Sequence, residues 1–394
     1  MSSSDRHLAT ICAHAGTPGK ESRAGNAPFI PPIVQTTLFD LGTTADAEAL
    51  FAGRQPGYTY TRFGNPTVER LAEVLAQLEA GAGALITASG NAAALCALTA
   101  ALRGKDDRIV THPDVYGGTL ELLRIFTERY RVPVEIVDPA RTVEWHAALA
   151  RASVVLIETP SNPLLRLLDL AATAERAHAA GAQLIVDNTV ATPYNQQPFQ
   201  FGADWIVHSA SKYLNGHSDM IGGCLIRRAP LTATHRTIHK NLGGTVNALD
   251  AWLMLRGLRT FTLRMEAHNH NGAAVADWLT RHPAVSHVHY PGLPTHPQAA
   301  LFRQQMRAGG ALLSFELHGG ADAACRFLDR IQLIVHAVSL GGMESLATRP
   351  AATSHRGLTA TQRQAAGMGD SLVRLSVGTE ALEDILTDLE QALR

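Results

Sequence analysis

Apolar and polar positions along the chain follow the periods of helices and strands in turn. In the stretch NPTVERLAEVLAQLE (65–79), Asn65 is a natural helix N-cap and Pro66 suits the first helical turn. The apolar residues that share one face of this predicted helix are Val68, Leu71, Leu75 and Leu78.

Short apolar runs then alternate with further helical stretches. The predicted strands span 83–87, 107–112, 154–159, 183–188 and 203–209, and predicted helices begin near 89, 119 and 169. Because near-continuous apolar strands alternate with helices, we expect an α/β fold with a mostly parallel sheet covered on both faces.

The pattern changes after about residue 250, where a long helical stretch (248–282) begins. Half-buried strands are predicted at 310–317 and 372–378, before an amphipathic closing helix. The predicted organisation is an arm contacting a neighbouring subunit (1–60), a large domain (61–250) and a smaller α+β domain (251–394).

Composition narrows the class of protein. The 394 residues are 46% hydrophobic and 18% charged with a net charge of −1, which is globular and gives no footprint for nucleic acid. The longest apolar stretch (92–102) is too short to span a membrane, and the start of the sequence lacks a signal-peptide pattern. The widely spaced Cys12, Cys96, Cys224 and Cys325 fit reduced thiols, so we expect a cytoplasmic protein.

The 18 histidines raise the question of a metal site. His287 and His289 would share a strand face, and HNH (268–270) is similar. Neither pair has Cys, Asp or Glu partners at ligand spacing, so no metal is expected.

Polar clusters fall at the ends of the predicted strands. They are Ser89-Gly90, 158–162, Asp187-Asn188 and 209–212. Ligands of parallel sheets bind at the carboxyl ends of strands, so these clusters mark the predicted site.

Lys212 stands out among the basic residues. The chain has 34 lysines and arginines, and its lysines are Lys20, Lys105, Lys212 and Lys240. The other three lie in stretches typical of a solvated surface, whereas Lys212 follows apolar and small residues. Unlike arginine, lysine can lose its proton and form an imine with an aldehyde, and burial lowers its pKa.

Asp187 ends a neighbouring predicted strand and completes a pattern that indicates pyridoxal 5'-phosphate (PLP). The ring nitrogen of this cofactor needs an acidic partner. Each residue also has an ordinary alternative, Lys212 as a surface lysine and Asp187 as a turn or helix-capping residue. Their joint position favours PLP.

A phosphate group needs amide donors at a helix start, together with hydroxyls. The predicted phosphate-binding residues are Ser89, Gly90, Asn91, Ser209 and Ser211. Tyr116 could stack on the pyridine ring, or be an ordinary core tyrosine.

Nine motifs follow in order along the chain: YTRFGNPT, ASGNAAA, DVYGGT, ETPSNP, VDNT, HSASKYLNGHSD, RGLRT, VSLGGMESL and VRLSVG. With them the sequence resembles the Cys/Met-metabolism (transsulfuration) family of PLP enzymes over essentially its whole length. The resemblance implies the PLP-dependent transferase fold of type I, with a seven-stranded-type sheet.

The resemblance also implies a role for each matching residue. Lys212 is expected to bind PLP covalently and then to move protons at the substrate, and Tyr116 to stack on the ring and act as acid–base. Arg374 is expected to bind the substrate carboxylate. The other implied cofactor residues are Asp187 and Thr189 at the ring and Gly90, Asn91, Ser209 and Ser211 at the phosphate, and the other implied substrate residues are Ser339 and Asn162.

The quaternary structure of the family is a further implication. Tyr60 and Arg62 are expected to reach the phosphate in a neighbouring subunit. The implied assembly is a homotetramer, a dimer of dimers whose active sites are shared between subunits.

Members of the family differ in the chemistry at Cβ and Cγ of the substrate. Where cystathionine γ-synthases and γ-lyases generally carry acidic residues, this chain has Thr59 and Val338. It has Glu121 where they carry an arginine, and Phe63 where the bacterial synthase has a second arginine. A charged distal group would lack its partners there, at a cost of several kcal/mol. Val338 matches the methionine γ-lyases, so the predicted reaction is γ-elimination from an amino acid with a neutral or cationic γ-substituent.

Other features keep alternatives open. Gly118 departs from the methionine γ-lyases, and TSHRGL (353–358) is similar to homoserine sulfhydrylases. The alternatives are γ-replacement on an activated homoserine, cystathionine γ- or β-lyase activity, and a catalytically inactive binding protein. A pocket-facing Glu121 would favour a cationic substrate such as canavanine, whereas a solvated Glu121 on a helix would not.

Overall fold

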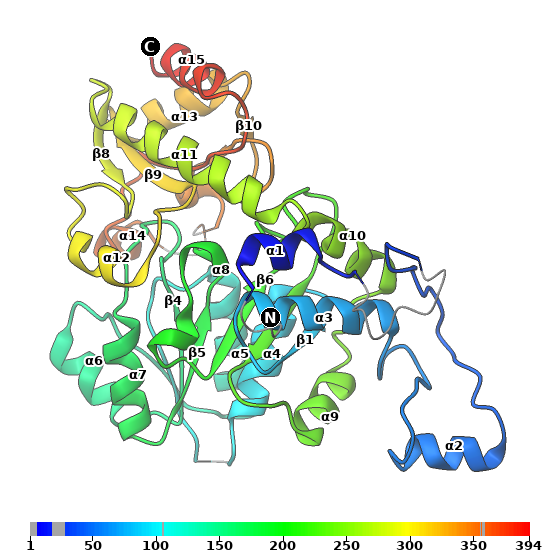
Figure 1. The fold of residues 1–394 in the computed structure, drawn as a ribbon. Helices are drawn as coiled ribbons and strands as arrows, with labels where there is room; N and C mark the ends of the chain where they lie inside the picture. The colour runs from blue at the N-terminus through cyan, green and yellow to red at the C-terminus, as the bar shows by residue number, and fades with distance from the viewer. Residues whose placement is uncertain (1–5, 18–27, 105, 355, 357–358) are drawn as a thin grey trace.

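The computed structural model describes residues 6–17, 28–104, 106–354, 356 and 359–394 (Figure 1). Lys20, Lys105 and three residues of the TSHRGL stretch (355, 357 and 358) lie outside them. The helices up to the large sheet's last strand are α1 (Leu8–Ala13), α2 (Thr44–Phe51), α3 (Pro66–Leu78), α4 (Gly90–Ala101), α5 (Gly117–Tyr130), α6 (Thr142–Leu149), α7 (Leu170–Ala179), α8 (Thr192–Asn195) and the 3₁₀ helix η3 (Pro198–Phe201). Those that follow are α9 (Ala233–Leu242), α10 (Ala248–Leu258), α11 (Phe261–Thr280), α12 (Ala299–Gln305), α13 (Gly320–Arg330), η4 (Pro350–Ala352), α14 (Ala360–Ala365) and α15 (Leu382–Leu393).

A seven-stranded sheet forms the centre of the larger part of the molecule, in the order β1-β7-β6-β5-β4-β2-β3. Its strands are β1 (Gly83–Thr87), β2 (Ile109–Thr111), β3 (Val134–Ile136), β4 (Val154–Glu158), β5 (Gln183–Asp187), β6 (Trp205–Ser209) and β7 (Gly223–Arg227). Strands β2 to β6 pair in parallel, whereas β7 runs antiparallel to both β6 and β1. The predicted mostly parallel α/β sheet is confirmed, and β3 and β7 are strands that the apolar pattern did not reveal.

Helices cover both faces of this sheet. Buried side chains of α3, α6 and α7 pack on one face, and those of α4 and α5 pack on the other. Helix α3 begins as predicted, because the Asn65 side chain accepts a hydrogen bond from the Thr67 amide next to Pro66. Its residues Leu71, Leu75 and Leu78 are buried.

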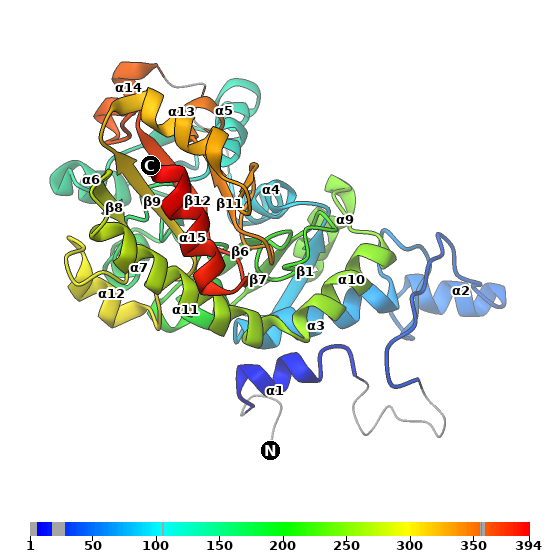
Figure 2. The ribbon, with the colours of Figure 1, turned by 90° about the horizontal axis from the view of Figure 1, so that it is seen from above.

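The C-terminal part holds a second, five-stranded sheet in the order β10-β11-β12-β9-β8. Its strands are β8 (Val285–His289), β9 (Leu312–Leu317), β10 (Val335–His336), β11 (Leu346–Thr348) and β12 (Leu372–Ser376). The prediction of half-buried strands was wrong here, since β12 is buried at every position and β9 at all but one. Helices α11, α13 and α15 cover one face of this sheet (Figure 2), and Val373 and Leu375 of β12 pack in the same core cluster as their buried side chains.

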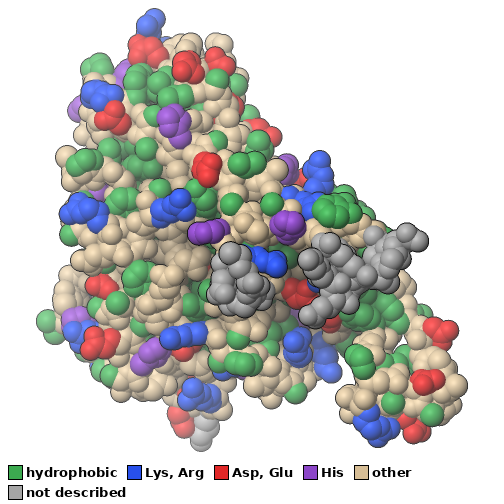
Figure 3. Space-filling view, in the orientation of Figure 1, with side chains coloured by type: hydrophobic (Ala, Val, Ile, Leu, Met, Phe, Trp, Pro, Cys, Tyr) green, Lys and Arg blue, Asp and Glu red, His purple; other side chains and the backbone are tan. Residues whose placement is uncertain are grey.

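Residues 6–17 and 28–60 extend along and away from this body. Helix α1 packs on α3 and α11, whereas α2 stands out at the end of an extended arm (Figures 1 and 3). Helix α2 contains no buried residue, and apolar arm side chains such as Leu38 and Phe51 are exposed.

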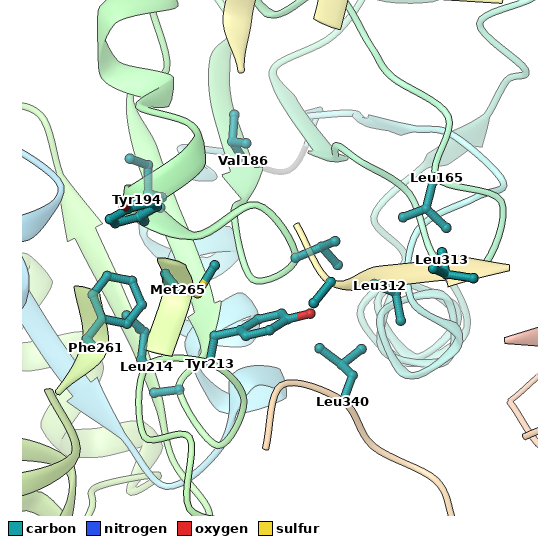
Figure 4. Close-up of a cluster of buried hydrophobic side chains, with 14 of the residues drawn as sticks. Leu165, Val186, Tyr194, Tyr213, Leu214, Phe261, Met265, Leu312, Leu313 and Leu340 are labelled. Atoms are coloured by element: carbon teal, nitrogen blue, oxygen red, sulfur yellow. The ribbon is translucent and has the colours of Figure 1, made fainter. Parts of the chain in front are cut away.

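The turn after β6 is held where the two sheets meet. The Tyr213 ring is buried near Leu312 and Leu340 of the C-terminal part (Figure 4). Arg264, on α11, donates to the backbone carbonyls of Tyr213 (2.7 Å) and Leu214 (3.2 Å) and to that of Gly257 (2.9 Å). The buried guanidinium thus provides hydrogen-bond donors for backbone carbonyls in the turn after β6 and near the C-terminal end of α10.

Over the described ranges, none of the helices combines the length and the apolar character needed to cross a bilayer. The cysteines are free thiols, with Cys12, Cys96 and Cys224 buried and Cys325 exposed.

We expect Arg264→Ala to lower the free energy of unfolding by about 3 kcal/mol, because it leaves buried carbonyls without their charged donor. Chemical denaturation followed by circular dichroism measures the change. The control is Arg281→Ala, which removes an exposed ion pair with Asp277 and should change stability little. Equal effects of the two substitutions would contradict the role given to Arg264.

Candidate active site

The polar clusters of β4, β5 and β6 meet at one edge of the large sheet. Glu158 and Asp187, the last residues of β4 and β5, are register partners. The Ser209 amide at the end of β6 donates to Thr189 Oγ1 (2.8 Å), just after β5. Parallel strands therefore bring these residues to one place although they are far apart in the sequence.

Asp187 is a half-buried carboxylate whose Oδ1 has two donors. It accepts from the Thr189 amide (3.0 Å) and from the Thr189 hydroxyl (2.5 Å). Burial raises the pKa of Asp187, while the Thr189 hydrogen bonds act in the opposite direction. A cation beside this carboxylate would offset the desolvation.

Lys212 lies in the turn after β6, and its Nζ donates to Ser339 Oγ (2.6 Å). Burial, with a smaller contribution from the positive charge of Arg374, lowers the pKa of Lys212 to about 8. A substantial fraction of this amine is therefore neutral near pH 7 to 8, the form that reacts with an aldehyde. Lys212 is not a solvated surface lysine.

Arg374, on β12, lies on the other side of Ser339. Its Nη2 donates to the Ser339 carbonyl (2.7 Å) and its Nη1 to Asn162 Oδ1 (3.3 Å). Arg374 Nε is buried and has no hydrogen-bond partner among the described residues. Ser339 has a φ of +90°, rare for a non-glycine residue, and this conformation presents its hydroxyl to Lys212 and its carbonyl to Arg374.

The start of α4 adjoins the end of β6. The Ser89 side chain caps α4 by accepting from the Ala92 amide (3.1 Å). A Cβ on Gly90 would lie 2.8 Å from Ser209 Cβ, so only glycine lets the helix start approach the strand so closely. Asn91 Nδ2 donates to the Gly118 carbonyl (3.2 Å), and the Ser211 hydroxyl is bonded to the Gly222 backbone.

Tyr116 directly precedes α5 and is half exposed, so it is not a core tyrosine. Its amide donates to Glu158 Oε2 (2.6 Å), which fixes the start of the helix. Glu158 belongs to a strand-end cluster that marks the predicted site, but the sequence assigned it no role there. Its hydrogen bond with the Tyr116 amide depends on how the start of α5 packs against the end of β4 in the folded chain.

Three of the predicted residues, Tyr60, Arg62 and Glu121, lie apart from this cluster, and a fourth, Val338, adjoins it through Ser339. Arg62 Nη1 donates to the Lys240 carbonyl (2.7 Å), and among the described residues neither Arg62 nor Tyr60 bonds to the groups around Lys212. The Glu121 side chain is 69% exposed and pairs with Arg124 (3.0 Å). Val338 precedes Ser339 and is 64% exposed.

The chemistry of this cluster fits PLP. The part-buried amine of Lys212, whose pKa is lowered, lies in the site, and the Asp187 carboxylate lies at the neighbouring strand end. The start of α4 follows Ser89, and Gly90 lets it approach Ser209 closely. The orphaned Nε of Arg374 leaves a donor for an anionic group.

The histidine pairs give no metal site. The His287 and His289 rings lie on one strand face, 4.5 Å apart, and His289 Nε2 is 3.1 Å from Glu316 Oε1. In the part of the chain that the structure describes, no three His, Cys, Asp or Glu side chains are arranged to hold a metal ion.

The fold and the lysine site together define a PLP-dependent enzyme of fold type I. A family model described as "Cys/Met metabolism PLP-dependent enzyme" matches residues 9–394, and the chain belongs to this family.

Similar proteins with known names carry out several reactions. The chain is 41% identical to L-methionine gamma-lyase of Fusobacterium nucleatum over 98% of both chains. It is 39% identical to O-succinylhomoserine sulfhydrylase of Pseudomonas aeruginosa, over 98% of this chain and 94% of that one. The crystal structure of cystathionine gamma synthase from Xanthomonas oryzae matches with a TM-score of 0.90 and 39% identity over 98% of both chains.

We expect borohydride reduction of the PLP-loaded protein to fix the cofactor on the peptide that contains Lys212. Mass spectrometry of a digest detects the added mass. Lys212→Ala should show no such peptide, whereas the control Lys240→Ala should keep it. Labelling that survives in Lys212→Ala would contradict the assignment of this amine.

Proposed function

We propose that the chain catalyses γ-elimination from an amino acid with an uncharged γ-substituent, such as the thioether of methionine. One observation carries this choice: the residue next to Ser339, whose hydroxyl contacts Lys212, is the uncharged Val338. At this position a charged distal group would find no charged side chain to pair with, whereas a neutral group needs none. The identity to an L-methionine gamma-lyase supports the same choice.

The cofactor residues follow from the site. When bound, PLP supplies an aldehyde for the substrate amine and a ring that takes up electrons from Cα. Asp187, held by Thr189, would keep the ring nitrogen protonated, and Tyr116 would stack on the ring. The residues that would hold the phosphate are Ser89, Gly90, Asn91, Ser209 and Ser211.

Lys212 and Tyr116 would move the protons. A Lys212 amine with a pKa of about 8 can accept the Cα proton in its neutral form. Tyr116, half exposed above this edge, would donate a proton to the leaving γ-group. Arg374 would hold the substrate α-carboxylate, with Asn162 and Ser339 keeping the guanidinium in place.

A second candidate is γ-replacement on an activated homoserine. The 39% identity to an O-succinylhomoserine sulfhydrylase favours it, since the same residues can serve both reactions. The ion pair of Glu121 with Arg124 supports a surface role for Glu121, so canavanine ranks below methionine as a substrate.

The arm supports a homotetrameric assembly with shared sites. Its exposed apolar residues, among them Leu38 and Phe51, would be covered by a second copy. Tyr60 and Arg62 would then reach the phosphate bound by the neighbouring subunit. The free cysteines support a reducing compartment, and we propose a cytoplasmic location.

A substrate panel tests the reaction. We expect methionine to release an α-keto acid and ammonia at least about tenfold faster than canavanine. The reason is that Glu121 is paired with Arg124 at the surface, so the site offers no carboxylate to the cationic end of canavanine. The same panel, with O-succinylhomoserine and a thiol, scores thioether formation by mass spectrometry. If thioether formation is faster than keto-acid release from every compound, γ-replacement and not γ-elimination is the reaction of this enzyme.

Glu121→Gln is the matched variant for the canavanine question. Its turnover of methionine and of canavanine should both stay close to those of the parent. A selective loss of canavanine turnover would show that Glu121 contacts the substrate in the pocket.

Mixing two inactive variants tests the shared sites. Arg62→Ala and Lys212→Ala should each have low activity alone. After the variants are unfolded together and refolded, mixed dimers regain sites with both residues intact, and up to about a quarter of the parent activity should return. No recovery, in mixtures that electrospray mass spectrometry shows to be hybrid, would rule out sharing through Arg62.

A further inference from the structure

Glu158 is a carboxylate inside the site that the proposed reaction does not use. It ends β4 and is 4% exposed. Its Oε2 accepts the Tyr116 amide at 2.6 Å, and its own amide donates to His112 Nε2 at 3.1 Å. One hydrogen bond therefore holds the Glu158 side chain and the other holds its backbone.

Glu158 and Asp187 lie side by side on one face of the sheet. They are register partners on parallel neighbouring strands, which are about 5 Å apart. The residues two positions earlier, Leu156 and Ile185, belong to the same buried cluster under α4 and α5, which shows that both carboxylates leave the same face. Two carboxylates at such a place do not both ionise readily.

The hydrogen bonds decide which of the two keeps the negative charge. Asp187 accepts two hydrogen bonds from Thr189 on one oxygen, and such donors stabilise the ionised form. Glu158 accepts one amide hydrogen bond and is the more deeply buried of the two. Burial and the charge of Asp187 raise the pKa of Glu158 well above its ordinary value.

Among the residues that the structure describes, none pairs a positive charge with the Glu158 carboxyl group. Asp187 faces it from β5, and Asp114 follows β2 and adds a second negative charge. Arg166 is paired with Asp114 (3.0 Å). Burial lowers the pKa of His112 to about 3, so this imidazole is neutral and accepts the Glu158 amide, although Asp138 acts in the other direction.

We propose that Glu158 is a protonated, neutral acid in the working enzyme, which positions Tyr116 while the negative charge stays on Asp187. A carboxylic acid keeps one acceptor oxygen and gains one donor. Oε2 accepts the Tyr116 amide, and the proton lies on Oε1. Glu158 is thus a positioning residue that acts through Tyr116 and Asp187. The inference rests on the proposed site only in that Asp187 serves as the partner of the PLP ring.

The apoenzyme provides a test that does not depend on activity. A Glu whose folded-state pKa is raised stabilises the fold most at low pH, and this contribution is lost as pH rises through the folded pKa. Glu158→Gln mimics the neutral acid and does not titrate. From about pH 5 to about pH 8, the unfolding temperature of the variant relative to the parent should rise by at least about 2 °C.

Glu73→Gln is the matched control, because it replaces an exposed carboxylate that pairs with Arg70. Its difference from the parent should stay nearly constant over the same pH range. If the Glu158→Gln difference is constant or falls with pH, Glu158 is ionised in the folded protein and the proposal is overturned.

The PLP-loaded enzyme gives the second readout. Glu158→Gln should keep kcat/KM within about threefold near neutral pH and lose the alkaline decline that ionisation of Glu158 causes in the parent. Glu158→Ala, which removes the acceptor for the Tyr116 amide, should lower kcat at least about tenfold with a smaller change in KM. If Glu158→Gln is as impaired as Glu158→Ala, the neutral-acid role is wrong. A parent inactive on every compound of the panel would refute the proposed reaction, and the apoenzyme measurement would still decide the state of Glu158.

Discussion

The contact between the Lys212 amine and the Ser339 hydroxyl joins the two sheets at the centre of the site. The two residues are 127 positions apart in the chain, and their 2.6 Å hydrogen bond depends on both parts of the molecule. Tyr213 packs the lysine turn into the core, and Arg264 holds its carbonyls. Because the amine is fixed in a desolvated place, its pKa falls into the range where it can react.

Charge is divided within the site in a way that matches its proposed ligands. The buried guanidinium of Arg374 and the part-buried amine of Lys212 lie where the site faces the C-terminal sheet, and Arg374 Nε has no partner among the described residues. Asp187 and Glu158 lie at the edge of the large sheet. Anionic groups are therefore favoured on one side and a cationic ring on the other, since each offsets a desolvation cost.

The sequence predicted the parts of the site that depend on strand ends. Apolar runs located β4, β5 and β6, and parallel pairing then brings their last residues together, as it does for Asp187 and Ser209. It did not predict β7, because the apolar run of that strand is only Cys224 to Ile226, between glycines and arginines. It left two interpretations open for Glu121 and gave Glu158 no role, since the exposure and contacts of a glutamate depend on which way a helix or strand end faces in the folded chain.

Several features of the site destabilise the folded state, and packing elsewhere in the molecule offsets them. Ser339 at φ +90°, the buried guanidinium of Arg374 beside the Lys212 amine, and the two adjacent carboxyl groups each oppose folding. They persist because β12 and β9 are buried almost throughout, and because the core cluster that contains Tyr213 continues from one sheet into the other. The strain is thus held by packing that does not depend on the ligand. Binding would then need little rearrangement, because the charges that would meet the substrate carboxylate and the ring are already fixed in position.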